Sequence, residues 1–169
     1  TIIYKVVGQG TDAMTSLKPG DTLDLLTGLG NGFDPAKSGD APVLVGGGVG
    51  VPPLYNLARK LIAAGKKPLV ILGFNKADEI FYAEEFKALG ADVAVTTGDG
   101  SFGGKGFVTH ALPENISFVY TCGPLPMLRA IKHYAQEKDI PAFLSLEERM
   151  ACGVGVCLGC VAKTTRTDE

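Results

Sequence analysis

Three of the four cysteines in this chain of 169 residues stand close together, at positions 152, 157 and 160. Thiolates are soft ligands that suit iron–sulfur clusters and zinc. The spacing C-x4-C-x2-C is that of plant-type [2Fe–2S] loops, which add a distant fourth cysteine. The intervening glycines allow a loop to fold around a cluster with its N–H groups turned toward sulfur. We therefore expect Cys152, Cys157 and Cys160 to be metal ligands in an iron–sulfur centre.

Zinc is the alternative metal for these three cysteines. Zinc sites usually pair a C-x2-C motif with a second such motif or with histidines. The two histidines, His110 and His133, are distant from the cysteines in sequence. The spacing therefore favours iron–sulfur over zinc.

A glycine-rich segment, Gly46–Pro53, follows a short apolar run and precedes a helical pattern. Where a buried strand turns into a helix, a phosphate can meet backbone N–H groups and the positive end of the helix dipole. The segment does not match the dinucleotide fingerprint G-x-G-x-x-G, because Val51 or Pro53 occupies its sixth position. A phosphate-binding loop is favoured, and a tight structural turn is the alternative.

Two further segments follow apolar runs and should face the same crevice. Thr121–Met127 contains a Cys-Gly-Pro turn, for which a buried thiol at a strand end is the alternative interpretation. Residues 73–79 should border an adenosine ribose. They contain two acids, Asp78 and Glu79, but no arginine that could bind a 2′-phosphate. This composition favours NAD(H) over NADP(H). Lys76 argues against this preference, and Asp78 could instead cap a helix.

The elements needed to position these segments alternate along the chain. The sequence predicts strands at 43–45, 69–72, 93–96, 117–121 and 142–146, and helices at 53–64, 78–89 and 125–138. Such alternation predicts an α/β fold with a five-stranded parallel, doubly wound sheet. Ligands of such sheets bind beyond the carboxyl ends of the strands.

The first 41 residues have a different pattern. Short strands are expected at 2–7 and 22–26, a helical turn at 12–17 and a polar linker at 34–41. Two short strands cannot form a stable sheet alone, so they resemble the end of a β-domain that begins before this chain. The expected domains are 1–41, 42–146 and 147–169, the last holding the cysteine loop.

Composition excludes several classes of protein. The net charge of −2 lacks the basic footprint of a nucleic-acid-binding protein. No apolar run reaches the roughly 18 residues of a membrane helix, and no signal peptide is evident. Clustered cysteines do not resemble the framework of a secreted disulfide domain. We therefore expect a cytoplasmic protein that binds neither nucleic acid nor membrane.

Five motifs together resemble a known family. The motifs are GQGT, LGNGF, GGGVGVPPL, CGPLPM and SLEERMACGVGVCLGC. They are similar to the electron-transfer subunit of class 1B (NAD-dependent) dihydroorotate dehydrogenase, in the ferredoxin–NADP reductase superfamily. The resemblance extends over essentially the whole chain.

The resemblance implies a FAD-binding β-barrel, of which residues 1–41 are the remnant, then an NAD-binding α/β domain and a [2Fe–2S] loop. It also implies an FMN-containing catalytic subunit as partner, in a heterotetramer with two copies of each subunit. Electrons from dihydroorotate would pass through FMN, the cluster and FAD to NAD⁺, in pyrimidine (UMP) biosynthesis. The cofactors carry this chemistry, so no residue of the chain is assigned as catalytic.

The same resemblance implies roles for individual residues. Gly10 and Thr11 would meet the FAD phosphates, and Gly30 and Asn31 would lie near the flavin. The nicotinamide dinucleotide would be bound by Gly46, Gly47, Gly48, Gly50 and Pro53, and the turn of Cys122, Gly123 and Pro124 would face the nicotinamide. Cys152, Cys157 and Cys160 would be three of the four cluster ligands.

Two departures from the family pattern lead to a further expectation. The Arg-x-Tyr-Ser flavin motif and the fourth cluster cysteine are not in this sequence. We therefore expect a fragment of a longer subunit. Two alternatives remain open: a reductase subunit of a related NAD(P)H-linked complex, such as a bifurcating transhydrogenase or sulfhydrogenase, and a zinc-stabilised nucleotide-binding module without a redox role.

Overall fold

The computed structural model describes residues 2–146, 148 and 151–162. It divides into two compact units. The larger unit contains Ile2, Ile3 and Phe33–Leu146, and the smaller contains Tyr4–Gly32 together with the described residues after 146. None of the described helices has both the length and the hydropathy that a membrane span requires.

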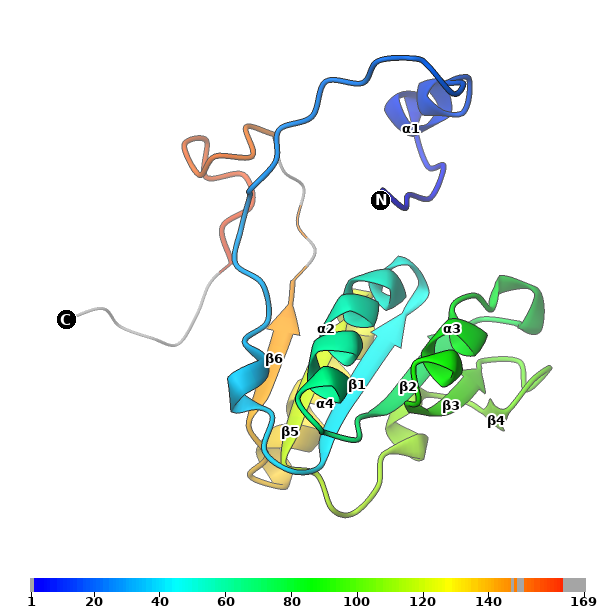
Figure 1. The fold of residues 1–169 in the computed structure, drawn as a ribbon, viewed down its shortest axis with the longest axis vertical. Helices are drawn as coiled ribbons and strands as arrows, with labels where there is room; N and C mark the ends of the chain where they lie inside the picture. The colour runs from blue at the N-terminus through cyan, green and yellow to red at the C-terminus, as the bar shows by residue number, and fades with distance from the viewer. Residues whose placement is uncertain (1, 147, 149–150, 163–169) are drawn as a thin grey trace. The chain divides into compact units, whose positions relative to one another are not determined.

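The larger unit is built on one parallel sheet (Figure 1). The strands are β1 (Pro42–Gly47), β2 (Leu69–Phe74), β3 (Asp92–Thr97), β4 (Gly104–Lys105), β5 (Phe118–Cys122) and β6 (Ala142–Ser145). Their order is β4-β3-β2-β1-β5-β6, and every neighbouring pair is parallel. The five predicted strands are therefore confirmed. The two-residue edge strand β4 was not predicted, because its glycine-rich sequence has no apolar pattern.

Helices cover both faces of this sheet (Figure 1). Helix α2 (Val51–Ala63) and helix α3 (Ala83–Ala88) pack on one face. Helix α4 (Leu125–Glu137) and the 3₁₀ turn Val108–Ala111 pack on the other. The remaining 3₁₀ turns are Pro35–Lys37, Gly48–Gly50 and Ala77–Glu79. This arrangement confirms the doubly wound α/β fold.

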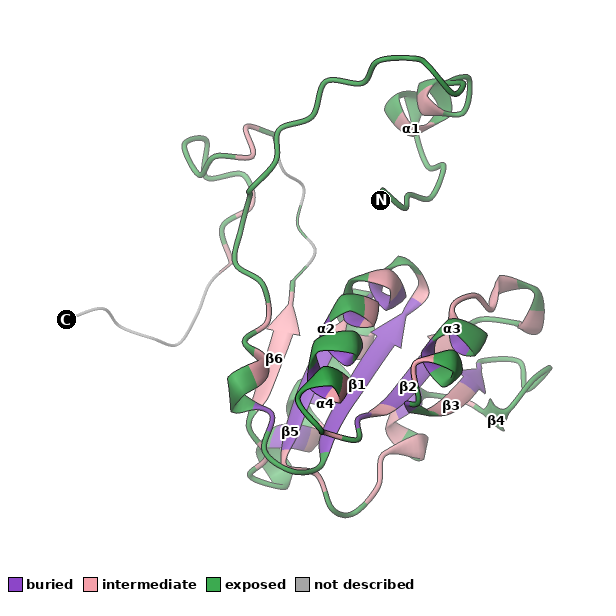
Figure 2. Cartoon of the chain, in the orientation of Figure 1, coloured by how far each residue is buried: buried purple, intermediate pink, exposed green. Residues whose placement is uncertain are grey.

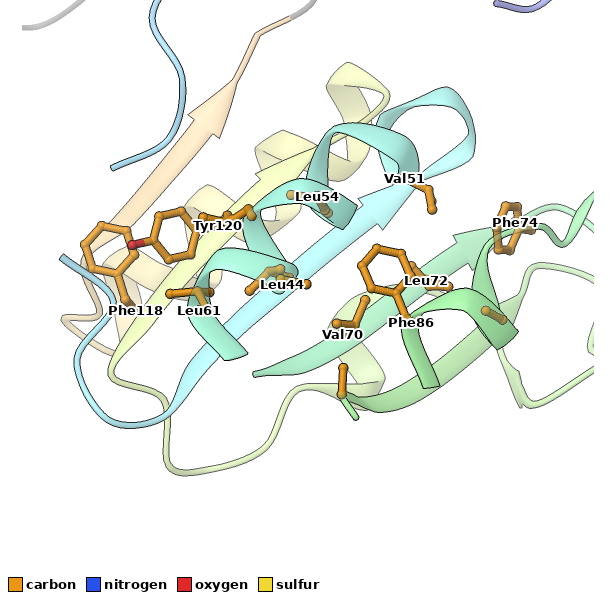
Figure 3. Packing of buried hydrophobic residues seen from close by; sticks show 14 residues of the cluster. Leu44, Val51, Leu54, Leu61, Val70, Leu72, Phe74, Phe86, Phe118 and Tyr120 are labelled. Carbon is orange, nitrogen blue, oxygen red and sulfur yellow. The ribbon is translucent and has the colours of Figure 1, made fainter. Parts of the chain in front are cut away.

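The core follows from the alternation of side chains along the strands. All six residues of β1 are buried, as Figure 2 shows. Leu44 and Tyr120 point toward α2 and α3, where they join Leu54 and Phe86 (Figure 3). Their strand neighbours point to the opposite face, where α4 packs. A strand buried on both faces reads as a continuous apolar run, which explains why the sequence pattern located it correctly.

Residues 34–41 are not a free polar linker but a strap on the sheet. The phenol of Tyr120 donates a hydrogen bond to the carbonyl oxygen of Asp34, at 2.7 Å. The Ser117 hydroxyl donates to the carbonyl oxygen of Ser38, at 2.6 Å, and accepts from the N–H of Ala41, at 2.9 Å. Phe33 makes an edge contact with the Tyr120 ring, with 5.5 Å between ring centroids. These contacts fix the chain where it enters β1.

The first 32 residues differ from the sequence prediction. Residues 2–7 and 22–26 form no strand; helix α1 spans Gln9–Met14 rather than 12–17. The physical reason is that a strand needs neighbours to satisfy its backbone, and the described residues supply none here. The segment leaves many apolar side chains exposed, among them Ile2, Val6, Val7, Leu23, Leu25 and Leu26.

The second predicted helix also begins later than expected. Asp78 does not cap a helix; it lies in the 3₁₀ turn Ala77–Glu79, and α3 starts at Ala83. Between the two, Ile80 is extended and Tyr82 has a left-handed backbone with φ of 66°. The acidic residues 78–79 therefore belong to the loop after β2, which bears on the site described below.

Candidate functional site

The carboxyl ends of β1 and β5 define the candidate site. These strands are neighbours at the centre of the sheet, and Gly46 pairs in register with Cys122. The chain builds outward from β1 through β2, β3 and β4, and then resumes on the other side with β5 and β6. Such a reversal of strand order opens a crevice for ligands. The structure therefore brings the two predicted segments, Gly46–Pro53 and Cys122–Pro124, together.

Glycines let the two loops touch along their backbones. A methyl group at Gly50 would overlap the carbonyl group of Cys122 and lie 2.6 Å from the amide nitrogen of Gly123. A methyl group at Gly123 would lie 3.0 Å from the nitrogen of Gly47 and 2.6 Å from the terminal methyl carbon of Met127. These two glycines are therefore required for packing, whether or not a ligand is bound.

Two other glycines of the segment have packing roles. A methyl group at Gly47 would lie 2.8 Å from the Met127 sulfur and 3.0 Å from the Pro124 ring. At Gly46 it would meet Val51 and Leu54 of α2, at 3.0–3.1 Å. Gly48 is different, because it has a φ of +51° and no atom within 4 Å of the methyl position. Gly48 is thus the glycine of the segment with room beside it for a ligand.

The start of α2 changes how a phosphate would be bound. The N–H of Val51 donates to the carbonyl oxygen of Gly48. The next two residues, Pro52 and Pro53, have no backbone N–H group. Donors for a phosphate must therefore come from the loop at residues 48–50, although the helix dipole still favours an anion there. Pro53 can contribute shape to the site but not a hydrogen bond.

The loops after β2 and β3 form a neighbouring wall. The sequence predicted a role only for the first of these loops, at residues 73–79. The Ser101 hydroxyl accepts a hydrogen bond from the N–H of Ala77, at 2.8 Å, and donates to Asp99, at 2.6 Å. The Asp99 carboxylate also accepts from the N–H of Ser101, so these hydrogen bonds hold the pKa of Asp99 below its usual value. The glycines at 98–106 are a sequence signal that could have drawn attention to this loop, although they do not reveal its partners.

The predicted flavin residues lie in the smaller unit. The Thr11 hydroxyl accepts hydrogen bonds from the N–H groups of Val7 and Gly8, at 3.0 and 3.2 Å, and donates to the carbonyl oxygen of Gly8. Thr11 therefore organises the start of α1, where Gly10 also lies. Gly30, with φ of +68°, and Asn31 are exposed. Their assignment to a flavin stays a prediction.

The three clustered cysteines lie in an irregular loop of the same unit. Cys157 is exposed, and Cys152 and Cys160 are half-buried. The N–H of Cys157 donates to the Cys152 sulfur, at 3.5 Å. This contact, followed by those of Val154 and Val156, lowers the pKa of Cys152 to about 6. Among the described residues, the structure gathers no three His, Cys, Asp or Glu side chains as a metal would require.

The donor chemistry of this loop nevertheless fits an iron–sulfur cluster. Iron–sulfur clusters are held by cysteine thiolates and tuned by N–H groups directed at sulfur. The contact between Cys157 and Cys152 is of this kind. Gly153 has φ of +72°, and its methyl position would lie 3.4 Å from Leu29 and 3.7 Å from Leu26, so the loop is packed at this point. Cys152, Cys157 and Cys160 would supply three thiolates.

Fold and crevice together define the nicotinamide-binding domain of an oxidoreductase. Residues 44–133 match the family model of the oxidoreductase NAD-binding domain. Residues 147–169 match the iron–sulfur cluster binding domain of dihydroorotate dehydrogenase B. The predicted cofactor classes of these two segments are thus confirmed.

Relatives place the chain more narrowly. It is 45% identical to the electron transfer subunit of dihydroorotate dehydrogenase B (NAD(+)) from Bacillus pumilus, with 100% of this chain aligned to 66% of that protein. The subunit from Fusobacterium nucleatum is also 45% identical, with 100% of this chain and 67% of the relative covered. The subunit from Lysinibacillus sphaericus is 48% identical, with 98% of this chain aligned to 65% of the relative. The chain belongs to the family of electron transfer subunits of dihydroorotate dehydrogenase B.

Two solved structures share the fold of this chain. An NADH-dependent reduced ferredoxin-NADP oxidoreductase, studied for flavin-based electron bifurcation, has a TM-score of 0.80 and 35% identity, over 93% of this chain and 58% of that one. The cytochrome b5 reductase domain of Ulva prolifera nitrate reductase shares the fold, with a TM-score of 0.52 and 18% identity. This match covers 63% of this chain and 48% of that one. The chain spans about two thirds of the length of the curated relatives it matches.

Proposed function

We propose that this chain serves in the transfer of electrons from a dihydroorotate-oxidising partner to NAD⁺. One observation carries the proposal: an NAD-binding domain and the iron–sulfur domain of dihydroorotate dehydrogenase B occur in one chain. The partner would be an FMN-containing catalytic subunit, assembled as two copies of each. The pathway would be pyrimidine (UMP) biosynthesis, in the cytoplasm. The proposed domains are residues 1–41, which contribute to flavin binding, residues 42–146, which bind NAD, and residues 147–169, which hold the cluster.

The electron balance explains why the chain needs no catalytic acid or base. Oxidation of dihydroorotate to orotate releases two electrons and two protons. NAD⁺ takes up two electrons and one proton as a hydride, and the other proton is released to solvent. When bound, FAD and the [2Fe–2S] cluster supply the electron-transfer chemistry. The task of this chain is then to bind and orient cofactors.

In the proposal, different residues of the chain bind the dinucleotide, the flavin and the cluster. Gly48 leaves room for the dinucleotide beside the loop at 48–50, while Gly50 and Gly123 lock the two crevice loops together. Cys122 stands at the carboxyl end of β5, beside the place proposed for the nicotinamide ring. Gly10, Thr11, Gly30 and Asn31 are proposed to contact FAD, and Cys152, Cys157 and Cys160 to hold the cluster.

The proposal is tested on the full-length subunit, purified with its catalytic partner. Cys157→Ser should abolish NAD⁺-linked oxidation of dihydroorotate, because it removes a cluster ligand from the only proposed route to NAD⁺. Oxidation linked to a dye that takes electrons directly from the partner serves as the internal control and should persist. Unchanged NAD⁺-linked activity in this variant would contradict the role of the cluster.

A second candidate function rests on the solved structure of the NADH-dependent reduced ferredoxin-NADP oxidoreductase. The chain could serve a related NAD(P)H-linked complex, such as a bifurcating transhydrogenase. The identity of the co-purifying partner decides between the two. A partner that oxidises dihydroorotate supports the first function, and a large iron–sulfur partner without that activity supports the second.

A further inference from the structure

The thioether of Met127 packs against both loops that form the crevice. Its sulfur lies beside Gly47, where a methyl group would be 2.8 Å from the sulfur and 3.5 Å from the Cε atom. Its Cε atom also lies beside Gly123, where a methyl group would be 2.6 Å from it. One side chain therefore fills the space that two glycines leave, one on each side of the crevice.

The backbone of Met127 is held in place by helix α4, which covers one face of the sheet (Figure 1). Leu128 and Ile131 are fully buried beneath this helix. The N–H of Leu128 donates to the carbonyl oxygen of Pro124, at 3.1 Å, and so fixes the first turn. Because the helix is anchored, any added bulk at the Met127 sulfur must be accommodated by the two loops.

Gly47 passes such a displacement to the loop at residues 48–50. It is the last residue of β1, and it is joined through one rigid peptide unit to Gly48, the glycine with open space beside it. The other end of this loop is fixed, because Gly50 lies against the carbonyl group of Cys122. The loop therefore cannot shift as a whole and must distort.

The surroundings of the Met127 sulfur suit a thioether but not a more polar group. Met127 packs against an apolar cluster that contains Val45 and Ile131. The ring of Pro124 lies beside the same position at Gly47, and a proline has no N–H group to donate. A polar atom placed on the sulfur would be costly to bury here without a hydrogen bond.

Oxidation by a peroxide places such an atom on a methionine. The sulfur attacks one oxygen of hydrogen peroxide, the O–O bond breaks, and the products are the sulfoxide and one water. The sulfur loses two electrons and the peroxide gains them. Met127 is half-buried, so its side chain is partly open to a small oxidant.

We propose that Met127 is an oxidation site: hydrogen peroxide converts its thioether to the sulfoxide, which distorts the loop at residues 47–50 and weakens binding of the dinucleotide. This inference rests on the proposed function in one respect, namely that a nicotinamide dinucleotide binds beside Gly48. It gives the crevice a response to oxidants that does not involve the cluster cysteines.

The test exposes the full-length subunit, purified with its catalytic partner, to hydrogen peroxide. Peptide mass spectrometry measures the sulfoxide at each methionine, and calorimetry measures the affinity for NAD⁺. As the sulfoxide of Met127 accumulates, the affinity of the wild type should fall at least about fivefold. Met127→Gln, which places a polar amide near the sulfur position, should bind NAD⁺ about fivefold more weakly without peroxide.

Met127→Leu separates this oxidation from damage to cysteines. Leucine is apolar and similar in size, so the untreated variant should bind NAD⁺ within about threefold of the wild type and should resist peroxide. Met14→Leu is the matched control, because Met14 is also half-buried but lies on α1. This variant should remain as sensitive to peroxide as the wild type.

Three results would overturn the inference and leave the proposed function intact. They are no sulfoxide at Met127, an unchanged NAD⁺ affinity in wild type oxidised at Met127, and an equal loss of affinity in Met127→Leu. A wild type that binds no NAD⁺ before peroxide is added would contradict the proposed function and overturn the inference with it.

Discussion

The backbone of Gly50 lies directly against the carbonyl group of Cys122, so closely that no side chain fits between them. This contact joins the loop after β1 to the turn after β5. It holds the two sides of the crevice at a fixed separation. The geometry of the proposed dinucleotide site therefore depends on a glycine whose own role is packing.

Gly50→Ala should damage both stability and binding. The added methyl group overlaps backbone atoms, which cannot move aside as a side-chain tip can, so we expect a loss of about 1–3 kcal/mol in the free energy of unfolding. NAD⁺ binding should weaken at least about tenfold. Denaturant unfolding and calorimetry measure the two effects.

Gly65→Ala is the control for this substitution. Gly65 has φ of +78° and nothing within 4 Å of its methyl position, so the cost is backbone strain of about 1–2 kcal/mol. NAD⁺ binding should stay unchanged, because Gly65 follows the far end of α2. Equal binding losses in both variants would show that the effect is general destabilisation.

Tyr120→Phe should destabilise the larger unit. The buried phenol donates to the carbonyl oxygen of Asp34 at 2.7 Å, and the substitution removes this hydrogen bond. We expect a loss of about 0.5–1.5 kcal/mol in the free energy of unfolding. Tyr134→Phe, which removes a longer bond of 3.3 Å to Pro113, should cost less. Equal losses would contradict the role of the strap.

Tyr120 also gives the protein a specific response to alkali. Burial, and then the charge of Asp34, raises the pKa of this phenol above its ordinary value near 10. The unfolded chain therefore releases this proton at a lower pH than the folded chain does. The contribution is fully present below about pH 10 and is lost as the pH rises through the folded-state pKa. Unfolding at pH 8 and 10.5 should show a smaller decline for Tyr120→Phe than for the wild type.

Ser117→Ala tests the strap at its other end. The hydroxyl makes two hydrogen bonds, to Ser38 at 2.6 Å and from Ala41 at 2.9 Å, and Ser38 is buried. Loss of both should cost about 1–3 kcal/mol. Ser16→Ala removes an exposed hydroxyl bonded to Ala13 and should change stability by less than about 0.5 kcal/mol. A Ser117→Ala protein as stable as Ser16→Ala would mean that the strap does not support the fold.

Gly73→Ala should introduce a clash that a second substitution, Val108→Ala, relieves. A methyl group at Gly73 would lie 2.6 Å from the Cγ1 atom of Val108. The single variant should lose about 1–3 kcal/mol through overpacking. In the double variant with Val108→Ala the clash is gone, so the combined loss should be smaller than the sum of the two single losses. Additive losses, measured by denaturant unfolding, would contradict this contact.

The sequence pattern predicted the central sheet well because its strands are buried on both faces. A continuous apolar run such as Val43–Val45 is typical of a parallel strand, and the loops that follow such strands had to meet at one edge of the sheet. The residues of the strap could not be found in this way. Asp34 and Ser38 look like linker residues, and their partners Tyr120 and Ser117 lie about 80 positions away in sequence.

The sequence predicted that the loops after β1 and β5 meet at one edge of the sheet, but it did not show what each glycine of these loops does. The glycines at 46–50 indicated a phosphate loop, yet the structure assigns Gly46, Gly47 and Gly50 to packing and leaves Gly48 open. The helix expected to begin at Asp78 begins only at Ala83, because residues 77–79 form a separate 3₁₀ turn in which Glu79 bonds back to Asn75, a contact that periodicity does not encode. The short strands expected at 2–7 and 22–26 failed because strands depend on neighbours.

The central claim is that this chain belongs to an iron–sulfur flavoprotein that delivers electrons to NAD⁺. The most direct measurement is an absorbance spectrum, with iron and zinc analysis, of the full-length subunit purified anaerobically with its catalytic partner. The account predicts flavin bands, a broad visible absorbance from the cluster and about two irons per subunit. A colourless subunit containing one zinc and no iron would contradict it, and would make the cysteine loop a structural metal site.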